Sequence, residues 1–136
     1  MLSTVCYISS ASKSLENLNL KHLYNTSKIN NAQQHITGIL IYQNGNFLQI
    51  LEGENKTINK LYRLIKSDNR HTNILQIINK SILAPIFEDY QTGFSIVDNS
   101  KKIERLKTYL KWVKSAEMES VDKIIGIIEN FIGLKV

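Results

Sequence analysis

The chain has 136 residues, of which 43% are hydrophobic, and its formal net charge is +5 at pH 7. This length and apolar content suit one domain with one core, and no apolar run of about 18 residues predicts a membrane span. The N-terminal stretch lacks the basic start and long apolar segment of a signal peptide, and the one cysteine is typical of a core residue in a reducing compartment, so we expect a cytoplasmic protein.

The first predicted elements are a strand and a helix. Residues 2–9 alternate as a strand, with Tyr7 on the same face as its second neighbours. Residues 14–28 follow helical spacing, and Ser14 can cap that helix. The polar residues 29–35 predict a loop.

A β-hairpin is predicted next, with strands at 36–43 and 46–52 around Asn44-Gly45, a pair typical of a type I′ turn. The second strand carries one polar residue, Gln49, inside an apolar run. Period two places Gln49 on one face with Phe47 and Leu51, and Leu48 and Ile50 on the other. If both faces are covered, Gln49 is a buried amide, and leaving it unpaired costs about 1–3 kcal/mol. The sequence therefore predicts a partner for Gln49.

A second helix is predicted at 55–67. It carries an apolar stripe at helical spacing, formed by Ile58, Leu61, Tyr62 and Ile65. Two more strands are predicted at 73–83 and 90–98. The order β-α-β-β-α-β-β predicts an α+β fold, a ferredoxin-like sheet with two helices on one face. The gap between those helices is a natural place for a ligand.

Residues 99–136 differ in character from residues 1–98 and predict a C-terminal extension of two helices. Ser100 can cap the first helix and Ser120 the second, whose apolar stripe runs from Val121 to Ile132. These helices either cover the free face of the sheet or bind a second chain, because so much apolar surface does not stay exposed to water.

Four segments occur together in one order and spacing: "YIS" (7–9), "NNAQQHITGILIY" (30–42), "GNFLQILEGE" (45–54) and "DNRH" (68–71). This pattern resembles the BLUF family, flavin-based blue-light sensors, over about residues 2–98. The resemblance implies that 1–98 is an FAD-binding photosensor domain, and that 99–136 serves sheet capping, oligomerisation or output. It also implies a short stand-alone sensor, not an enzyme, that signals to a separate effector protein, and we expect a homo-oligomer.

The resemblance also implies roles for individual residues. Asn31 would pair with the N–H and carbonyl edge of the flavin ring, and Gln49 would bridge a flavin acceptor to the Tyr7 hydroxyl. Light would draw an electron and a proton from Tyr7 and leave the Gln49 hydrogen bonds rearranged. The further cofactor contacts implied by the resemblance are Lys28, Asn30, Ile65, Asp68, Arg70 and His71, with Asp68, Arg70 and Lys28 toward the ribityl and phosphate part of FAD. Tyr90 and Thr92 stand where many family members have tryptophan and methionine, so a tryptophan-based relay is not carried over.

Three other functions stay open beside the photosensor. One is a flavin-free protein-interaction module of the same fold, and a second is a flavin enzyme, although no substrate base or nucleophile is evident. The third is nucleic-acid binding through the positive charge. The densest cationic cluster, between Lys101 and Lys114, lies on a predicted helix with Glu104, which favours a solvated helix face. No metal-ligand spacing occurs among the histidines and Cys6, so no metal is expected.

Overall fold

The computed structural model describes residues 1–11, 20–68, 71–88, 90, 93–115 and 121–133, and for 20–23, 71, 115 and 121 it describes the backbone alone. The elements in chain order are β1 (Leu2–Ala11), α2 (Leu20–Gln33), β2 (Thr37–Gln43), β3 (Asn46–Glu54), α3 (Asn55–Lys66), β4 (His71–Ser81), β5 (Phe94–Val97), α4 (Ser100–Ser115) and α5 (Val121–Gly133).

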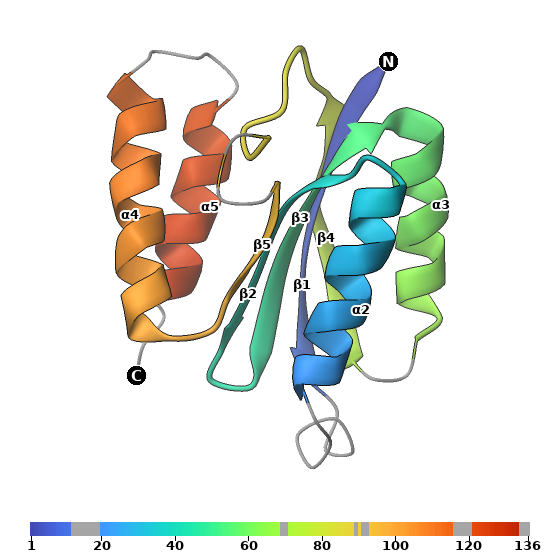
Figure 1. Cartoon of the computed structure of the whole chain (residues 1–136), viewed down its shortest axis with the longest axis horizontal. Coiled ribbons are helices and arrows are strands. Elements are labelled where there is room, and N and C mark those ends of the chain that lie inside the picture. The colour runs from blue at the N-terminus through green and yellow to red at the C-terminus, as the bar shows by residue number, and fades with distance from the viewer. Residues whose placement is uncertain (12–19, 69–70, 89, 91–92, 116–120, 134–136) are drawn as a thin grey trace.

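The strands form one five-stranded sheet in the order β4-β1-β3-β2-β5 (Figure 1). β5 runs parallel to β2, and the other neighbouring strands are antiparallel. β1 and β2 are thus separated by β3, which is the split βαβ arrangement of a ferredoxin-like sheet with one strand added at the edge. The predicted α+β, ferredoxin-like fold is confirmed.

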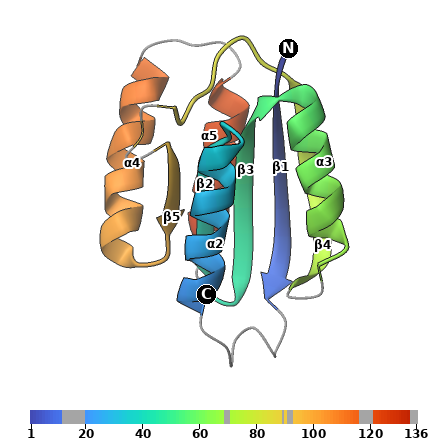
Figure 2. The ribbon, with the colours of Figure 1, turned by 45° about the vertical axis from the view of Figure 1, so that its right-hand side comes forward.

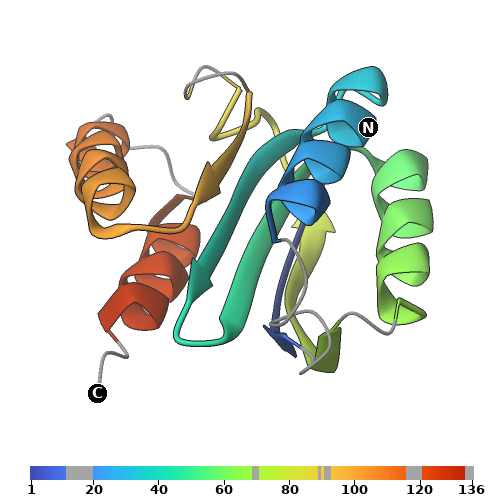
Figure 3. The same cartoon turned by 60° about the horizontal axis from the view of Figure 1, so that its bottom comes forward.

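Helices cover both faces of the sheet. Figure 2 shows α2 and α3 in front of the central strands, and Figure 3 shows α4 and α5 on the other side of the sheet. The core beneath α2 and α3 includes Val5, Tyr7, Leu40, Phe47, Leu51, Ile58 and Tyr62. The core beneath α4 and α5 includes Cys6, Ile39, Ile41, Leu48, Ile50, Leu106, Leu110, Ile124 and Ile128. The predicted division of β3 into a Phe47–Leu51 face and a Leu48–Ile50 face is confirmed.

The C-terminal helices bury their own apolar stripe. Ile124, Ile125, Ile128 and Ile132 on α5 are each at most 3% exposed and belong to the same cluster as the sheet residues Ile39 and Ile50. Of the two arrangements that the sequence left open for the free sheet face, the structure has the one within a single chain. This stripe is therefore not available to a second copy of the chain.

The hairpin between β2 and β3 turns through two residues with positive φ. Asn44 has φ 54° and Gly45 has φ 79°, as a type I′ turn requires at its two central positions. The predicted turn is confirmed.

The end of α2 differs from the prediction, because the helix continues to Gln33 and the expected loop at 29–35 is wrong for its first five residues. His35 has φ 57°, the Ile36 N–H bonds to the Asn31 carbonyl at 2.9 Å, and the His35 N–H bonds to the Ala32 carbonyl at 3.2 Å. These two bonds and the left-handed residue make a Schellman motif, with the buried Ile36 packed behind it. The motif was missed because glycine or asparagine, and not histidine, usually marks this position.

β5 is shorter than predicted, beginning at Phe94 instead of residue 90. The Tyr90 N–H bonds to the Phe87 carbonyl at 3.2 Å and the Gly93 N–H to the Tyr90 carbonyl at 3.0 Å, so the chain turns where a strand was expected. The buried Tyr90 instead stacks on Tyr109 of α4, with ring centroids 4.6 Å apart. Position 92 lies outside the described residues.

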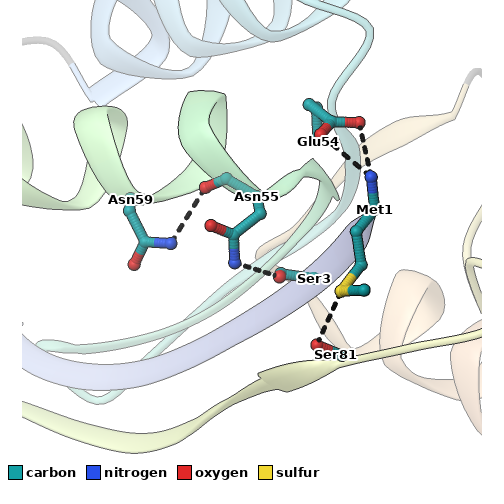
Figure 4. A network of polar contacts seen from close by, with 6 residues as sticks. All are labelled: Met1, Ser3, Glu54, Asn55, Asn59 and Ser81. Atoms are coloured by element: carbon teal, nitrogen blue, oxygen red, sulfur yellow. Dashed lines mark hydrogen bonds and ion pairs between the residues drawn. The ribbon is translucent and has the colours of Figure 1, made fainter.

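A polar network fixes α3 to the beginning of β1 (Figure 4). The Asn55 amide donates to the Ser3 hydroxyl at 2.6 Å, and the Asn59 amide donates to the Asn55 carbonyl at 2.9 Å. The Met1 ammonium also lies 3.0 Å from the Glu54 carboxylate. The first turn of α3 is therefore held over β1, the strand that carries Tyr7.

Candidate functional site

Tyr7 and Gln49 face each other on neighbouring central strands. Tyr7 on β1 is the register partner of Gln49 on β3, so both side chains lie on the face covered by α2 and α3. Tyr7 is 3% exposed and Gln49 is 5% exposed. The Tyr7 hydroxyl donates a hydrogen bond to Gln49 Oε1. This contact identifies the partner of the Gln49 carbonyl.

Two side-chain amides in this layer, those of Gln49 and Asn31, have donors or acceptors without a partner among the residues that the structure describes. Gln49 Nε2 forms no hydrogen bond with any residue that the structure describes, and neither does the side-chain amide of Asn31. Asn31 is 3% exposed and lies near the end of α2, where its backbone carbonyl accepts from the Gln34 and Ile36 N–H groups. Because unpaired buried amides are costly, these donors and acceptors fit a ligand with a polar edge.

The phenol of Tyr7 is held in its neutral form. Burial raises the pKa of Tyr7 well above its usual value, and Tyr62 and the nearby Asp68 carboxylate act in the same direction. Tyr62 lies on α3 with its ring centroid 5.6 Å from that of Tyr7. Ile65 is half-buried one turn later and packs against the same core. At neutral pH Tyr7 therefore keeps its proton and donates a hydrogen bond to Gln49.

The other predicted residues are placed differently. Asn30 and Lys28 are exposed on α2, and Lys28 lines two hollows on the β5 flank of that helix. Arg70 lies outside the described residues, and only the backbone of His71, the first residue of β4, is described. The structure thus brings together Tyr7, Gln49 and Tyr62 and keeps Asp68 within electrostatic reach.

Glu52 is a buried residue that the sequence analysis did not single out. It is 1% exposed, and its carboxylate accepts bonds from the Ile86 N–H at 2.6 Å, the Phe87 N–H at 3.0 Å and the Thr37 hydroxyl at 2.9 Å. The sequence did contain a signal for this site: period two places Glu52 on the same face as Leu48 and Ile50. A carboxylate buried on that face requires hydrogen-bond donors. Glu52 ties β3 to the segment between β4 and β5.

A family model described as sensors of blue-light using FAD, named BLUF, matches residues 2–93, which is more than half of the chain. The chain belongs to the BLUF family. Its buried phenol and amides fit a flavin, because the isoalloxazine edge carries an N–H donor between carbonyl acceptors and one amide can pair with such an edge. This BLUF domain is therefore a flavin-binding blue-light sensor module.

Individual BLUF proteins agree with this assignment. The photoactivated adenylate cyclase subunit beta of Euglena gracilis is 41% identical over 76 residues, which cover 56% of this chain and 9% of that protein. The dark-state structure of BlrB, a BLUF protein, has a TM-score of 0.67 at 28% identity and covers 93% of this chain and 94% of BlrB. Klebsiella pneumoniae BlrP1 with FMN and cyclic diGMP has a TM-score of 0.78 at 25% identity, over 98% of this chain and 35% of BlrP1. The chain thus spans about a tenth of the length of the cyclase subunits that it matches.

Two properties of the described residues bear on other functions. None of the described helices is long and apolar enough to cross a membrane. Across the ranges that the structure describes, no three His, Cys, Asp or Glu side chains are grouped so that they can hold a metal ion.

Proposed function

We propose that this BLUF domain is a blue-light photoreceptor that binds FAD non-covalently, with Tyr7, Asn31 and Gln49 as the inner contacts of the ring. The observation that carries the proposal is the hydrogen bond from Tyr7 to Gln49 Oε1, beside a Gln49 Nε2 with no partner among the described residues. The Gln49 carbonyl oxygen is thus bonded to the phenol, and the Gln49 Nε2 N–H groups are available to an acceptor of the ring. The family description supports FAD, whereas FMN is the flavin named with BlrP1.

The photochemistry follows from these two side chains. A bound flavin supplies the absorption of blue light and, once excited, an acceptor for one electron. Tyr7 gives up one electron and passes its hydroxyl proton to Gln49 Oε1. One electron and one proton return to Tyr7, the proton coming from Gln49 Oε1 if the amide has rotated and from Nε2 if it has become the tautomer, so no charge and no covalent bond remain. The Gln49 amide is left rotated or tautomerised, which exchanges its donor and acceptor toward the ring.

The remaining proposed contacts lie further from the phenol. Ile65 would line the ring between the helices, and Asp68 would accept a hydrogen bond from a ribityl hydroxyl. Arg70, His71, Asn30 and Lys28 are proposed to border the ribityl and phosphate end. The exposure of Asn30 and Lys28 is compatible with such an outer position only.

A chain of contacts supports output through the C-terminal helices. Glu52, three residues beyond Gln49 on β3, binds the backbone of Ile86 and Phe87, and the Tyr109 hydroxyl of α4 donates to the Ile86 carbonyl at 2.5 Å. We propose that the Gln49 rearrangement passes along β3 and this segment to α4, and from there to a separate effector protein. The domain itself would act as a sensor and not as an enzyme. If it forms a homo-oligomer, the contact surface lies outside the buried stripe of α5.

An absorption spectrum before and after blue light tests the proposal. The purified protein, or the protein refolded with FAD, should be yellow and should show a small, reversible red shift after illumination. Extraction of the pigment and chromatography distinguish FAD from FMN. A yellow protein whose spectrum does not respond to light would contradict the photoreceptor.

The principal alternative is a flavin-free interaction module of the same fold. It predicts a colourless protein that takes up no flavin on refolding. Steady turnover with NAD(P)H would favour a flavin enzyme instead, and a salt-sensitive mobility shift would favour nucleic-acid binding.

A further inference from the structure

A second hollow lies on the far flank of α2 from the Tyr7–Gln49 pair. It has a volume of about 360 Å³ and is enclosed by α2, β5 and the first turns of α4; we call it the α2–α4 groove. Ile96 and Val97 of the edge strand β5, whose side chains point to opposite faces of the sheet, contribute apolar surface, and Tyr24 and Tyr90 contribute aromatic surface. β2 and β5 lie on this side of β3 in the sheet, away from β1, which carries Tyr7. Tyr24 and Ile96 nevertheless belong to the same hydrophobic cluster as Tyr7.

The charges around the α2–α4 groove are predominantly positive. Lys28 comes from α2, and Lys102 and Arg105 come from α4, against one carboxylate, Asp98. Asp98 is already paired, since its Oδ1 lies 3.2 Å from Lys102 Nζ. Among the described residues neither Lys28 nor Arg105 forms an ion pair. Two cations from opposite walls can thus neutralise an anion between them; Lys28, proposed above to border the FAD phosphates, would serve this anion instead.

A buried hydroxyl in the wall provides an independent indication of a ligand. Tyr24 is 7% exposed, and its hydroxyl oxygen is closed off from water and has no hydrogen-bond partner among the residues that the structure describes. A buried hydroxyl normally has a partner, because burying it unpaired is unfavourable. Burial raises the pKa of Tyr24, and Asp98 acts in the same direction, so the hydroxyl stays a donor. Because this oxygen is closed off from water, the Tyr24 side chain would have to rotate toward the groove for its hydroxyl to reach an acceptor there.

We propose that the α2–α4 groove binds a small phosphate-bearing molecule, which pairs with Arg105 and Lys28 and accepts a hydrogen bond from the Tyr24 hydroxyl. Phosphate suits the groove better than a carboxylate, because its two negative charges match two unpaired cations and its oxygens accept from several donors at once. The apolar and aromatic surfaces accommodate the body of an ester. Since α2 and α4 both contribute cations, the ligand would link the flavin-binding half of the molecule to the C-terminal helices.

Isothermal titration calorimetry on the flavin-loaded protein in the dark tests this site. The three probes are sodium phosphate, adenosine monophosphate and adenosine. Phosphate-bearing probes should bind at least about tenfold more tightly than adenosine, as expected for charge-assisted hydrogen bonds. Equal binding of phosphate and monophosphate assigns the groove to free phosphate, and tighter binding of the monophosphate assigns it to a phosphate ester; both outcomes support a phosphate site.

Two variants and a control locate the binding. Arg105→Ala should weaken the binding of the tighter probe by about tenfold or more, whereas Lys101→Ala, which removes an exposed cation from the same helix outside the groove, should change it less than twofold. Without a probe, Tyr24→Phe should raise the midpoint temperature of thermal unfolding, because the unpaired buried hydroxyl is removed. With the tighter probe, the increase in this midpoint should be smaller in Tyr24→Phe than in the native chain. The blue-light red shift of Arg105→Ala should equal that of the unmodified protein, which separates this site from the proposed photochemistry.

Three results would overturn the proposal. One is an equal loss of affinity in Lys101→Ala and Arg105→Ala, which would indicate unspecific attraction. Another is binding of adenosine as tight as that of its monophosphate, or no binding of any probe at millimolar concentration. The third is loss of FAD, but not of riboflavin, from Arg105→Ala, which would assign the groove to the phosphates of FAD itself.

Discussion

At the scale of single residues, the site depends on strand register. Period two groups the residues within each strand by face, and the register that pairs Tyr7 with Gln49 brings both side chains to the same side of the sheet. A slip of one residue would turn Gln49 to the opposite core. Asn31 was assigned to a loop, so its burial at the end of a helix could not be foreseen. The partners of Glu52 were equally out of reach, because its donors are backbone N–H groups of an irregular segment more than thirty residues away.

Replacing Asn31 tests the proposed ring contact. Asn31→Ala should weaken FAD binding by about tenfold or more, since a buried amide would lose its hydrogen bonds to the ring. Gln33→Ala removes an exposed amide from the end of the same helix and is the matched control. Fluorescence titration of flavin measures both affinities. Equal, small losses in the two variants would show that Asn31 does not contact the cofactor.

Glu52 predicts a pH-dependent contribution to stability. Burial raises the pKa of this carboxyl above its usual 4.5, and its bonds to Ile86, Phe87 and Thr37 offset only part of that effect. A carboxyl whose pKa is higher in the folded than in the unfolded protein stabilises the folded state when it is protonated. This stabilisation is complete at pH values below the pKa of the unfolded state, and it is lost as the pH rises through the pKa of the folded state. Lowering the pH from 7 toward 5 should therefore stabilise the native protein relative to Glu52→Gln in urea unfolding. The exposed Glu104→Gln serves as control, and a stability difference that does not change with pH would contradict the assignment.

At the scale of elements, local sequence signals were sufficient where turn chemistry is strong. Asn44-Gly45 specified its hairpin, and the stripe on α3 specified its buried face. Local signals were insufficient where tertiary contacts determine the boundary of an element. One example is the C-terminus of α2, where His35 and Ile36 form the Schellman motif. The same holds for the start of β5, because Tyr90 packs against α4 instead of extending the strand.

Gly38 is the element-scale position with the least tolerance. It has φ 143°, and a Cβ there would lie 1.9 Å from the Ile50 carbonyl oxygen of the paired strand. Gly38→Ala should therefore lower the free energy of unfolding by about 3 kcal/mol or more, combining backbone strain and overpacking. Gly126→Ala in α5, where an added Cβ meets nothing within 4 Å, should instead stabilise by about 0.5–1 kcal/mol. Chemical denaturation compares them, and equal effects would refute the steric argument.

At the scale of the whole molecule, the C-terminal helices are part of the core. The sequence indicated a large apolar stripe but not its partner, because amphipathicity specifies which face is buried and not which surface covers it. The structure places α5 against the sheet, and the Glu52–Ile86–Tyr109 contacts connect the same helical layer to β3. Packing of the C-terminal helices and the proposed light response are thereby linked through one segment.

This arrangement predicts how α5 variants behave. Ile128 is fully buried, so Ile128→Ala should lower the free energy of unfolding by about 2–5 kcal/mol, independent of protein concentration. Ile127→Ala, at a half-buried position on the same helix, should cost clearly less. Thermal or chemical unfolding at several concentrations is the measurement. If Ile128→Ala dissociated an oligomer and left the stability of the monomer unchanged, the buried position of the stripe would be wrong.

The central claim is that light acts on the hydrogen bond between Tyr7 and Gln49. The most direct test is the absorption difference between illuminated and dark protein, recorded for the native chain, Tyr7→Phe and Tyr62→Phe, each loaded with FAD. Tyr62 is the matched control, because its ring lies beside Tyr7 while only Tyr7 donates to Gln49. The account predicts a reversible red shift in the native chain and in Tyr62→Phe, and no red shift in Tyr7→Phe. A normal red shift in Tyr7→Phe would contradict it.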